Sequence, residues 1–281
     1  MQTGLKDKVV LITGASGGIG RAIADEFAAE GAQLALLGHR QFSELEERVA
    51  AKPWADRALC VKADIKRPED LDSAVARVVE RFGRIDVCVA NAGIWPPEDV
   101  PLHRLTETRI REVVDVNLLG AVWTARAFLA ALAESGPRAD GDGASLVFTG
   151  STAGQFGERN HVDYSLSKSG LYGLVRTLKN EIVELDPYGR VNMVEPGWTV
   201  TEMARPALRD PAKITQALST MPVRQLGRDV DIARSIVFLS SPQLARHLSG
   251  QVLTAAGGME GRTLWADGEI DVASVRARVE Q

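Results

Sequence analysis

The sequence has few of the residues that build a disulfide framework or a metal centre. It contains two cysteines, Cys60 and Cys88, and both fall in predicted buried strands, where a free cysteine behaves as a small apolar side chain. Four histidines are scattered without the spacing of zinc ligands: His39, His103, His161 and His247. We therefore expect neither a disulfide nor a metal site.

Long apolar runs and an excess of basic charge are also missing. No run of about 18 consecutive apolar residues occurs, the length that a membrane-spanning helix requires. A glycine-rich segment begins close to Met1 and leaves no room for a signal peptide. The net charge is −4, and no basic cluster is interleaved with aromatic residues. We expect a cytoplasmic protein that binds neither membranes nor nucleic acid.

The apolar segments that are present alternate with helical patterns. Seven of them predict strands near residues 9–13, 33–37, 58–62, 85–90, 145–149, 190–194 and 251–255. This alternation is typical of an α/β fold, a doubly wound parallel sheet with ligands at the carboxyl ends of its strands. Because 45% of the residues are apolar and composition is even up to the tail, we expect one Rossmann-like domain, residues 1–260, followed by a tail, residues 261–281.

A glycine-rich turn follows the first predicted strand. Residues 8–12 are a β-branched apolar run that leads into Thr13-Gly14-Ala15-Ser16-Gly17-Gly18-Ile19-Gly20, and a helical pattern follows over 21–30. Glycines let the backbone approach a pyrophosphate and present N–H groups at the positive end of a helix. No Gly-Lys-Ser/Thr follows, so the turn is not a Walker loop. It predicts a dinucleotide site.

Tyr164 and Lys168 are four residues apart on an expected helix, so their side chains share one face. A free tyrosine has a pKa of about 10, and a working value near 7 requires a depression of about 3 units, or about 4 kcal/mol. A cation about 4 Å away contributes about 4 kcal/mol at an effective dielectric of 20. Such a pair alone more often lies on a solvated helix face, but the glycine turn favours an active site.

Together these residues resemble the short-chain dehydrogenase/reductase family, and the match extends from residue 7 to about residue 260. Ala90-Asn91-Ala92-Gly93 resembles the family's N-A-G motif, and Pro196-Gly197 with Thr201 resembles its nicotinamide loop. Ser151 precedes Tyr164 by thirteen residues, the usual separation in the family. The resemblance implies a catalytic set of four: Asn117, Ser151, Tyr164 and Lys168.

The resemblance also implies a role for each member of that set. Tyr164 would be the general acid or base, and Ser151 would donate a hydrogen bond to the reacting oxygen. Lys168 would lower the tyrosine pKa and bind ribose, and Asn117 would hold a water on the lysine. Ser151 as a helix N-cap and Asn117 as a backbone partner are the alternatives. The cofactor residues implied are Gly14, Ser16, Gly18, Ile19, Gly20, His39, Arg40, Asp64, Ile65, Asn91, Ala92, Gly93, Tyr164, Lys168, Pro196, Gly197, Thr199 and Thr201.

The end of the second strand bears on the choice of cofactor. Gly38 stands where NAD-preferring relatives place an aspartate, and this acid is absent. His39 and Arg40 could attract a 2′-phosphate, and Ser16 stands where some NADP-dependent relatives carry a basic residue. We expect NADP as cofactor. Because Arg40 could simply face solvent, use of NAD as well stays open.

Residues 198–223 correspond to the segment that covers the substrate in the family. Five apolar residues there line a lid or form the core of its helix: Met203, Leu208, Ile214, Leu218 and Met221. Trp95 could form the opposite wall of the pocket. We hypothesise that Arg159 or His161 contacts a polar or anionic part of the substrate. Glu195 departs from the small residue of relatives and lies either near the cofactor or in a structural pair.

The predicted function is hydride transfer between NADP(H) and a carbonyl or secondary alcohol, as in 3-oxoacyl carrier-protein reductases and related ketone and sugar reductases. The alternative is a non-catalytic nucleotide-sensing protein, but such proteins typically lose the tyrosine. Epimerases differ in glycine pattern, and enoyl reductases space tyrosine and lysine more widely. The resemblance implies homo-oligomers, either dimers or tetramers, joined through the Asn117 and Tyr164 helices. The tail, with Trp265 and three valines on one helical face, is either frayed or docked on a neighbouring subunit.

Overall fold

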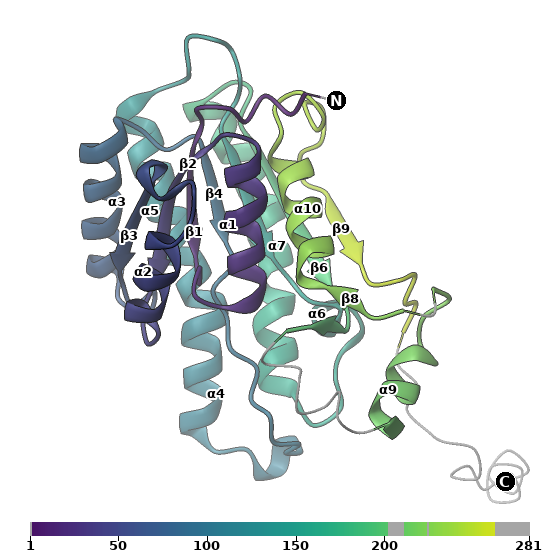
Figure 1. Cartoon of the computed structure of the whole chain (residues 1–281). Helices are drawn as coiled ribbons and strands as arrows, with labels where there is room; N and C mark the ends of the chain where they lie inside the picture. Colours follow the sequence, from purple (N-terminus) through teal and green to yellow (C-terminus); the bar gives the residue numbers. More distant parts are fainter. Residues whose placement is uncertain (1, 202–210, 224, 262–281) are drawn as a thin grey trace, which may run out of the picture.

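A parallel sheet lies between two layers of helices (Figure 1). The structure is a computed structural model, and it describes residues 2–201, 211–223 and 225–261. The expectations for Met203 and Leu208 in the lid, and for residues 262–281 of the tail, fall outside the described residues.

All seven predicted strands are present in the central sheet. They are β1 (Val9–Thr13), β2 (Gln33–Gly38), β3 (Ala58–Lys62), β4 (Val87–Ala90), β5 (Ser145–Thr149), β6 (Arg190–Pro196) and β9 (Val252–Ala255). Every neighbouring pair is parallel, in the order β3-β2-β1-β4-β5-β6-β9, which confirms the predicted Rossmann-like fold. Chain order reverses between β1 and β4, and in such sheets ligands bind in the crevice at that point.

Each face of the sheet has its own apolar core, because successive side chains of a strand point to opposite faces. Val10 and Ile12 of β1 pack with Phe27 on one face, and Leu11 packs with Phe128 on the other. The first face is covered by α1 (Gly18–Ala29), α2 (Phe42–Ala50) and α10 (Asp229–Ser240). The second is covered by α3 (Pro68–Phe82), α5 (Gly120–Ser135) and α7 (Val162–Leu185).

Shorter elements gather at the carboxyl ends of the strands, in the lower half of Figure 1. They are α4 (Glu107–Val114), α6 (Thr152–Phe156), α9 (Pro211–Leu218) and the strand pair β7 (Thr199–Val200) and β8 (Gly227–Arg228). Two 3-10 turns, η1 (Ala55–Arg57) and η2 (Leu102–Arg104), lie in connections. A π-helical turn, η3 (Asp115–Leu119), joins α4 to α5.

The helical stretch Glu107–Ser135 is long enough, with a mean hydropathy of 1.5, to cross a membrane by length and composition alone. Polar residues interrupt the stretch, so it contains no uninterrupted apolar run of that length. Its most apolar window is 44% buried inside the fold. Phe128 and Leu132 lie in the core beside the sheet, as expected of a core helix of a globular domain.

Both cysteines are free. Cys88 on the central strand β4 is buried, but Cys60 is only partly buried, contrary to expectation. The reason is position, because β3 is the edge strand of the sheet. Burial raises the pKa of the Cys60 thiol to about 11, with the nearby Glu46 carboxylate acting in the same direction, so Cys60 is a poor nucleophile.

Candidate active site

A cavity of about 590 Å³ opens at the carboxyl ends of the central strands. It brings together all the residues expected to bind the cofactor, from Gly14 in the first turn to Thr201 after β7. Of the four expected catalytic residues, Ser151, Tyr164 and Lys168 border the cavity. Asn117 lies behind its wall and is 1% exposed.

The glycine turn fits closely against the following motif. Gly14 has a φ of +67°, and a Cβ atom added there would lie 2.7 Å from the Cα atom of Ala92. A side chain at position 14 is therefore excluded by both conformation and space. Gly17, Gly18, Ile19 and Gly20 border the cavity at the start of α1, where backbone amides and the helix dipole favour an anion. These residues fit the pyrophosphate of a dinucleotide.

Asn91 joins the ends of three strands under the cavity. Its Nδ2 donates to the carbonyl oxygen of Thr13 at 3.1 Å, and its Oδ1 accepts from the Thr149 hydroxyl at 3.3 Å. Thr13 Oγ1 accepts the backbone N–H groups of Asn91 and Ala92 at 3.1 and 3.2 Å. These bonds hold β1, β4 and β5 in register where the cavity begins.

Tyr164 and Lys168 lie one turn apart on α7 and share the cavity. The Lys168 Nζ atom is 5.9 Å from the centroid of the Tyr164 ring and donates to the carbonyl oxygen of Thr149 at 2.8 Å. Lys168 is 5% exposed, and this burial lowers the pKa of its ammonium to about 8. A cation that is partly desolvated therefore lies beside the phenol at neutral pH.

Ser151 both caps a helix and borders the cavity. Its Oγ accepts the backbone N–H of Ala153 at 3.2 Å, so Ser151 is the N-cap of α6. A hydroxyl that accepts one hydrogen bond still has its own proton to donate. The N-cap alternative is thus present in the structure, and it leaves the donor of Ser151 for a ligand in the cavity.

Asn117 occupies the π-helical turn η3 and is bonded mainly to backbone. Its Oδ1 accepts the N–H of Ile94 at 2.8 Å, and its Nδ2 donates to the Ile94 carbonyl at 2.9 Å and to Ser167 Oγ at 3.1 Å. A Cβ atom at Gly93 would lie 3.2 Å from Asn117 Oδ1 and 3.4 Å from Lys168 Nζ. Glycine at position 93 therefore lets Asn117 and Lys168 approach the same point from two helices.

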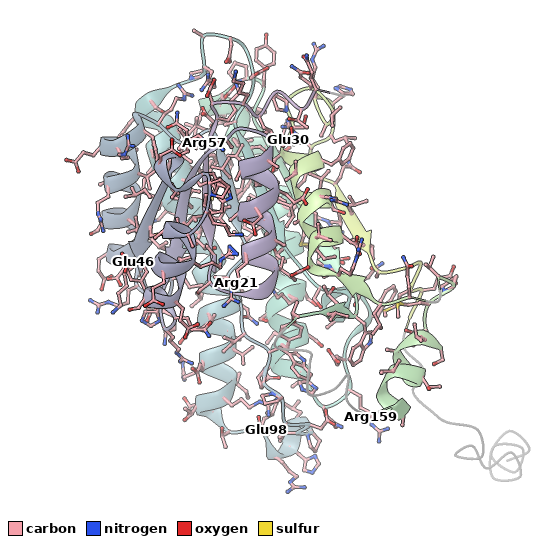
Figure 2. The ribbon with its side chains drawn as sticks, in the orientation of Figure 1. Arg21, Glu30, Glu46, Arg57, Glu98 and Arg159 are labelled. Atoms are coloured by element: carbon pink, nitrogen blue, oxygen red, sulfur yellow. The ribbon has the colours of Figure 1, made fainter. Side chains whose placement is uncertain are left out.

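Two basic residues border the far end of the cavity, each near a carboxylate. The guanidinium of Arg40 lies 3.1 Å from Glu112 on the surface, and His39 Nε2 lies 3.9 Å from Asp64. A Cβ atom at Gly38 would lie 3.0 Å from Leu45 Cδ2, so this position has little room for an acidic side chain. Arg21, labelled in Figure 2, donates to the Ser16 carbonyl at 2.7 Å and supports the turn between them.

The substrate end of the cavity differs from the sequence hypothesis. His161 is 1% exposed and lies behind Trp95, with its ring stacked on the indole at a centroid distance of 4.9 Å, so the expectation that it meets the substrate is wrong. Arg159 is exposed at the lower end of the molecule in Figure 2 and does not border the cavity. Trp95 does border it, as expected.

Sequence reasoning missed several residues that border the cavity, among them Thr152 and Glu158. Glu158 lies in the same short segment as Arg159 and His161, so the segment was recognised but the residue was not. A loop has no period that tells which of its side chains turns inward. The fold is therefore needed to show which of these side chains faces the cavity.

Two further expectations concerned lid residues and Glu195. Met221 is 5% exposed and packs with Ala217, Ala256 and Met259 in a small apolar core, and none of Met221, Ile214 and Leu218 borders the cavity. Glu195 is fully buried, accepts a 2.5 Å hydrogen bond from the Tyr172 hydroxyl and one of 3.3 Å from Thr254, and is therefore in a structural pair. Among residues 2–201, 211–223 and 225–261, no group of His, Cys, Asp and Glu side chains could hold a metal ion.

Comparison with known proteins agrees with this architecture. The chain is 35% identical to L-rhamnose 1-dehydrogenase (NAD(P)(+)) of Azotobacter vinelandii, and the match covers 91% of this chain and 97% of the relative. It is 32% identical to 3-oxoacyl-(acyl-carrier-protein) reductase of Staphylococcus epidermidis over 90% of this chain and 99% of the relative. It is also 32% identical to cis-2,3-dihydrobiphenyl-2,3-diol dehydrogenase of Paraburkholderia xenovorans, over 91% of each chain.

These relatives act on chemically different substrates, but all are dehydrogenases or reductases by name. The family model described as short chain dehydrogenase matches residues 8–212, which span the glycine turn, the tyrosine and the lysine. The chain belongs to the short-chain dehydrogenase/reductase family of NAD(P)-dependent oxidoreductases.

Proposed function

We propose that Tyr164 is the general acid and base of a hydride transfer between NADP(H) and a carbonyl or secondary alcohol. The observation that carries this proposal is the approach of the Lys168 ammonium to the Tyr164 ring, at 5.9 Å, inside the cavity that the glycine turn borders. The nicotinamide, when bound, supplies or accepts the hydride. The side chains of this protein move the proton and hold the reacting oxygen.

In the reducing direction, the Tyr164 phenol gives its proton to the carbonyl oxygen as hydride arrives at carbon. Ser151 donates a hydrogen bond to the same oxygen and stabilises the charge that develops there. In the oxidising direction, the Tyr164 phenolate accepts the proton of the alcohol. Asn117 lies beside Lys168 and would order a water that connects the lysine to solvent.

The electrostatics support this assignment. A unit charge about 6 Å away stabilises a phenolate by about 3 kcal/mol at an effective dielectric of 20, and the Lys168 ammonium, 5.9 Å from the centroid of the Tyr164 ring, acts in this direction. Tyr164 is also the third residue of α7, where the helix dipole contributes about 0.5 kcal/mol in the same direction. The lysine therefore supplies most of the depression that catalysis near pH 7 needs.

For the cofactor, we propose a preference for NADP(H) over NAD(H). His39 and Arg40 border the cavity at the end where the ribose of the adenosine would lie, and Gly38 leaves no acid to repel a 2′-phosphate. Their neighbours Asp64 and Glu112 reduce the local positive charge, which is why use of NAD remains compatible with the site. Dissociation constants for NADPH and NADH measure the preference.

For the whole chain, we propose a single domain over residues 1–260, with a substrate lid over about 198–223. We propose association into dimers or tetramers through the helices that carry Asn117 and Tyr164. A nucleotide-sensing protein without catalysis is disfavoured because Tyr164, Lys168 and Ser151 are all present at one cavity. A sensor has no need of this proton-transfer set.

Replacement of Tyr164 by phenylalanine tests the assigned proton donor. Substrates to screen are L-rhamnose with NADP⁺ and a 3-oxoacyl thioester with NADPH, chosen from the chemistry of the relatives. In Tyr164→Phe, kcat should fall by at least about 100-fold because general acid–base catalysis is lost. The dissociation constant for NADPH, followed by nicotinamide fluorescence, should change little. Near-normal turnover in Tyr164→Phe would refute Tyr164 as the proton donor.

A further inference from the structure

A buried carboxylate lies directly before the proposed catalytic tyrosine. Asp163 is 1% exposed, in the first turn of α7, and its Oδ1 accepts the backbone N–H of Tyr164 at 2.9 Å. A negative charge at this position suits the positive end of a helix. It also lies one residue from a phenol that must ionise, where a like charge disfavours the phenolate.

The compensating cation comes from a different helix. Arg109 on α4 places its Nε 2.8 Å from Asp163 Oδ2, and its Nη1 donates to the carbonyl oxygen of Glu98 at 2.9 Å. The Arg109 side chain is 17% exposed and that of Asp163 is 0% exposed, so solvent screens the pair little. Figure 2 shows Glu98 at the lower end of the molecule, near α4.

A second set of contacts joins the residues just before α7 to the loop that contains Trp95 and Glu98. His161 Nε2 lies 2.9 Å from the Pro96 carbonyl, and its ring stacks on Trp95, which borders the cavity. Asn160 has a φ of +67°, an uncommon conformation for a residue with a side chain, and its carbonyl accepts the N–H of Val100 at 3.1 Å. These contacts thus connect the cavity wall at Trp95 to the start of α7, the helix that carries Tyr164.

We propose that Arg109 and Asp163 form a positioning pair for Tyr164, in which Arg109 fixes the first turn of α7 to α4 and neutralises the carboxylate of the residue directly before Tyr164. This inference rests on the proposed role of Tyr164 and adds to it two residues outside the cavity lining. The charged groups near the start of α7 come from three regions: Asp163 and Lys168 on α7 itself, Arg109 on α4, and Glu98, Asp99 and Glu158 in loops. Arg109 balances Asp163, which leaves Lys168 to act on Tyr164.

The acidity of Tyr164 distinguishes a positioning pair from an ion pair that only stabilises the fold. If the pair only stabilised the fold, replacing either of its charged residues by a neutral one would leave the pKa of Tyr164 unchanged. The chain has three tyrosines, and tyrosinate absorbance in an ultraviolet titration reports all of them. Subtracting the same titration in a Tyr164→Phe background isolates Tyr164. Burial and the Glu195 carboxylate raise the pKa of Tyr172 well above its usual range, which keeps that residue apart. This readout needs no substrate.

In Arg109→Met, the unpaired Asp163 carboxylate should raise the apparent pKa of Tyr164 by about one unit. In Asp163→Asn, whose amide oxygen can still accept the Tyr164 N–H, the unpaired Arg109 should lower it. In the double variant Arg109→Met/Asp163→Asn, no unpaired charge remains, and the apparent pKa should return to near the wild-type value. A loss of stability alone would not shift the apparent pKa of Tyr164 in opposite directions in the two single variants. If Arg109→Met fails to fold, Asp163→Asn and the double variant still decide the question.

Turnover gives the second readout. In Arg109→Met, kcat should fall by about 10- to 100-fold because the phenol is misplaced and less acidic, while KM and the NADPH dissociation constant change by less than about three-fold. Arg109→Lys, which keeps the charge but loses the bond to Glu98, should recover part of kcat. The matched control is Arg111→Met on the same helix, since Arg111 forms an exposed ion pair with Glu107 at 2.7 Å.

The outcomes separate this inference from the proposed function. Unchanged Tyr164 acidity in folded Arg109→Met and Asp163→Asn variants, with kcat within about two-fold of wild type, would overturn the positioning role. Retained turnover in Tyr164→Phe would instead overturn the proposed function, whatever Arg109 does. An effect of Arg111→Met as large as that of Arg109→Met would show a general response of α4 and also contradict the proposal.

Discussion

Lys168 is a residue whose proposed function opposes the stability of the fold. Its ammonium is buried, and desolvation lowers its pKa from 10.5 to about 8. The folded protein therefore binds this proton less tightly than the unfolded chain does. Stability should rise with pH between about 8 and 10.5, and below pH 8 the whole cost of about 3 kcal/mol is present. A residue kept at such a cost is expected where chemistry requires it.

Lys168→Met should therefore stabilise the cofactor-free protein at pH 7. Removing the buried charge recovers about 3 kcal/mol, from which the lost hydrogen bond to the Thr149 carbonyl subtracts about 1 kcal/mol. Urea unfolding should show a gain of about 2 kcal/mol at pH 7 that shrinks towards pH 10.5, together with loss of turnover. A variant less stable than wild type at both pH values would contradict this account of the buried ammonium.

Glu195 gives a second residue-scale effect, of opposite origin. Burial raises the pKa of its carboxyl group, more than the hydrogen bonds from Tyr172 and Thr254 lower it. The folded state therefore holds this proton more tightly than the unfolded state, so stability is full below the unfolded pKa of about 4.3 and falls as pH rises towards the folded pKa.

In Glu195→Gln, this fall of stability with pH should disappear. The amide cannot ionise and can still accept a hydrogen bond from Tyr172, so the variant should be more stable than wild type at pH 8 and similar at pH 4 to 5. Thermal unfolding across this pH range is the measurement. Glu46→Gln, an exposed position labelled in Figure 2, is the control and should leave the pH dependence unchanged.

At the scale of elements, the end of α10 depends on one buried arginine from β6. Arg190 is 4% exposed, and it donates to the carbonyl oxygens of Leu239, Ser240 and Ala245 at 2.6, 3.0 and 3.1 Å. Burial lowers the pKa of Arg190 to about 10, so it remains charged at neutral pH. A cation at the carboxyl end of a helix satisfies unpaired carbonyls and complements the helix dipole.

Arg190→Met should destabilise the protein by about 3 kcal/mol, since three buried carbonyl oxygens lose a charged donor. Arg190→Lys should recover part of this, because an ammonium has donors but cannot span the same three acceptors. Denaturant unfolding measures both, and protection of α10 amides from hydrogen exchange locates the effect. A loss below about 1 kcal/mol in Arg190→Met would show that water replaces the guanidinium.

Elements were predicted well where burial imposes a simple pattern. Parallel strands are covered on both faces, so β1 appears in the sequence as the unbroken run Val9 to Ile12, and its bounds were found. The fourth strand begins at Val87 rather than at residue 85, and the Asp86 carboxylate just before it accepts hydrogen bonds from Arg84 and from the backbone N–H of Val9. That bond joins residues 77 apart, and no local pattern contains it.

The candidate site likewise combines residues that local spacing predicts with contacts between distant parts of the sequence. The glycines, Ser151, Tyr164 and Lys168 were predicted to share one site because their spacing is local and particular to the family, and all of them border the cavity. The contact of Arg109 with Asp163 spans 54 residues, and that of His161 with Pro96 spans 65, so neither could be inferred from one sequence. These contacts, which lie outside the cavity lining, therefore became visible only in the fold.

At the scale of the whole molecule, the helix that carries Tyr164 has an apolar outer surface. Leu166 is 56% exposed and Val162, one turn earlier, is 38% exposed. Gly173, two turns after Leu166 on the same face, has open space around it and would allow a second helix to approach closely. Leu119, at the end of η3, is 37% exposed and belongs to the helix that carries Asn117. Contiguous exposed apolar side chains of this kind mark association surfaces.

Leu166→Glu should therefore dissociate the proposed oligomer. In a symmetric helix interface, the substitution buries one carboxylate from each subunit. The two carboxylates would lie on either side of the two-fold axis without a cation between them and would repel each other. Light scattering after size exclusion should show dimers or tetramers for wild type and a smaller species for Leu166→Glu. Leu102→Glu, at a position 62% exposed on η2, is the matched control and should keep the wild-type mass.

Because Leu166 is two residues from Tyr164 on α7, loss of association should also lower kcat if the partner helix helps to hold the catalytic turn. Identical masses for wild type and Leu166→Glu would exclude this helix face as the contact between subunits.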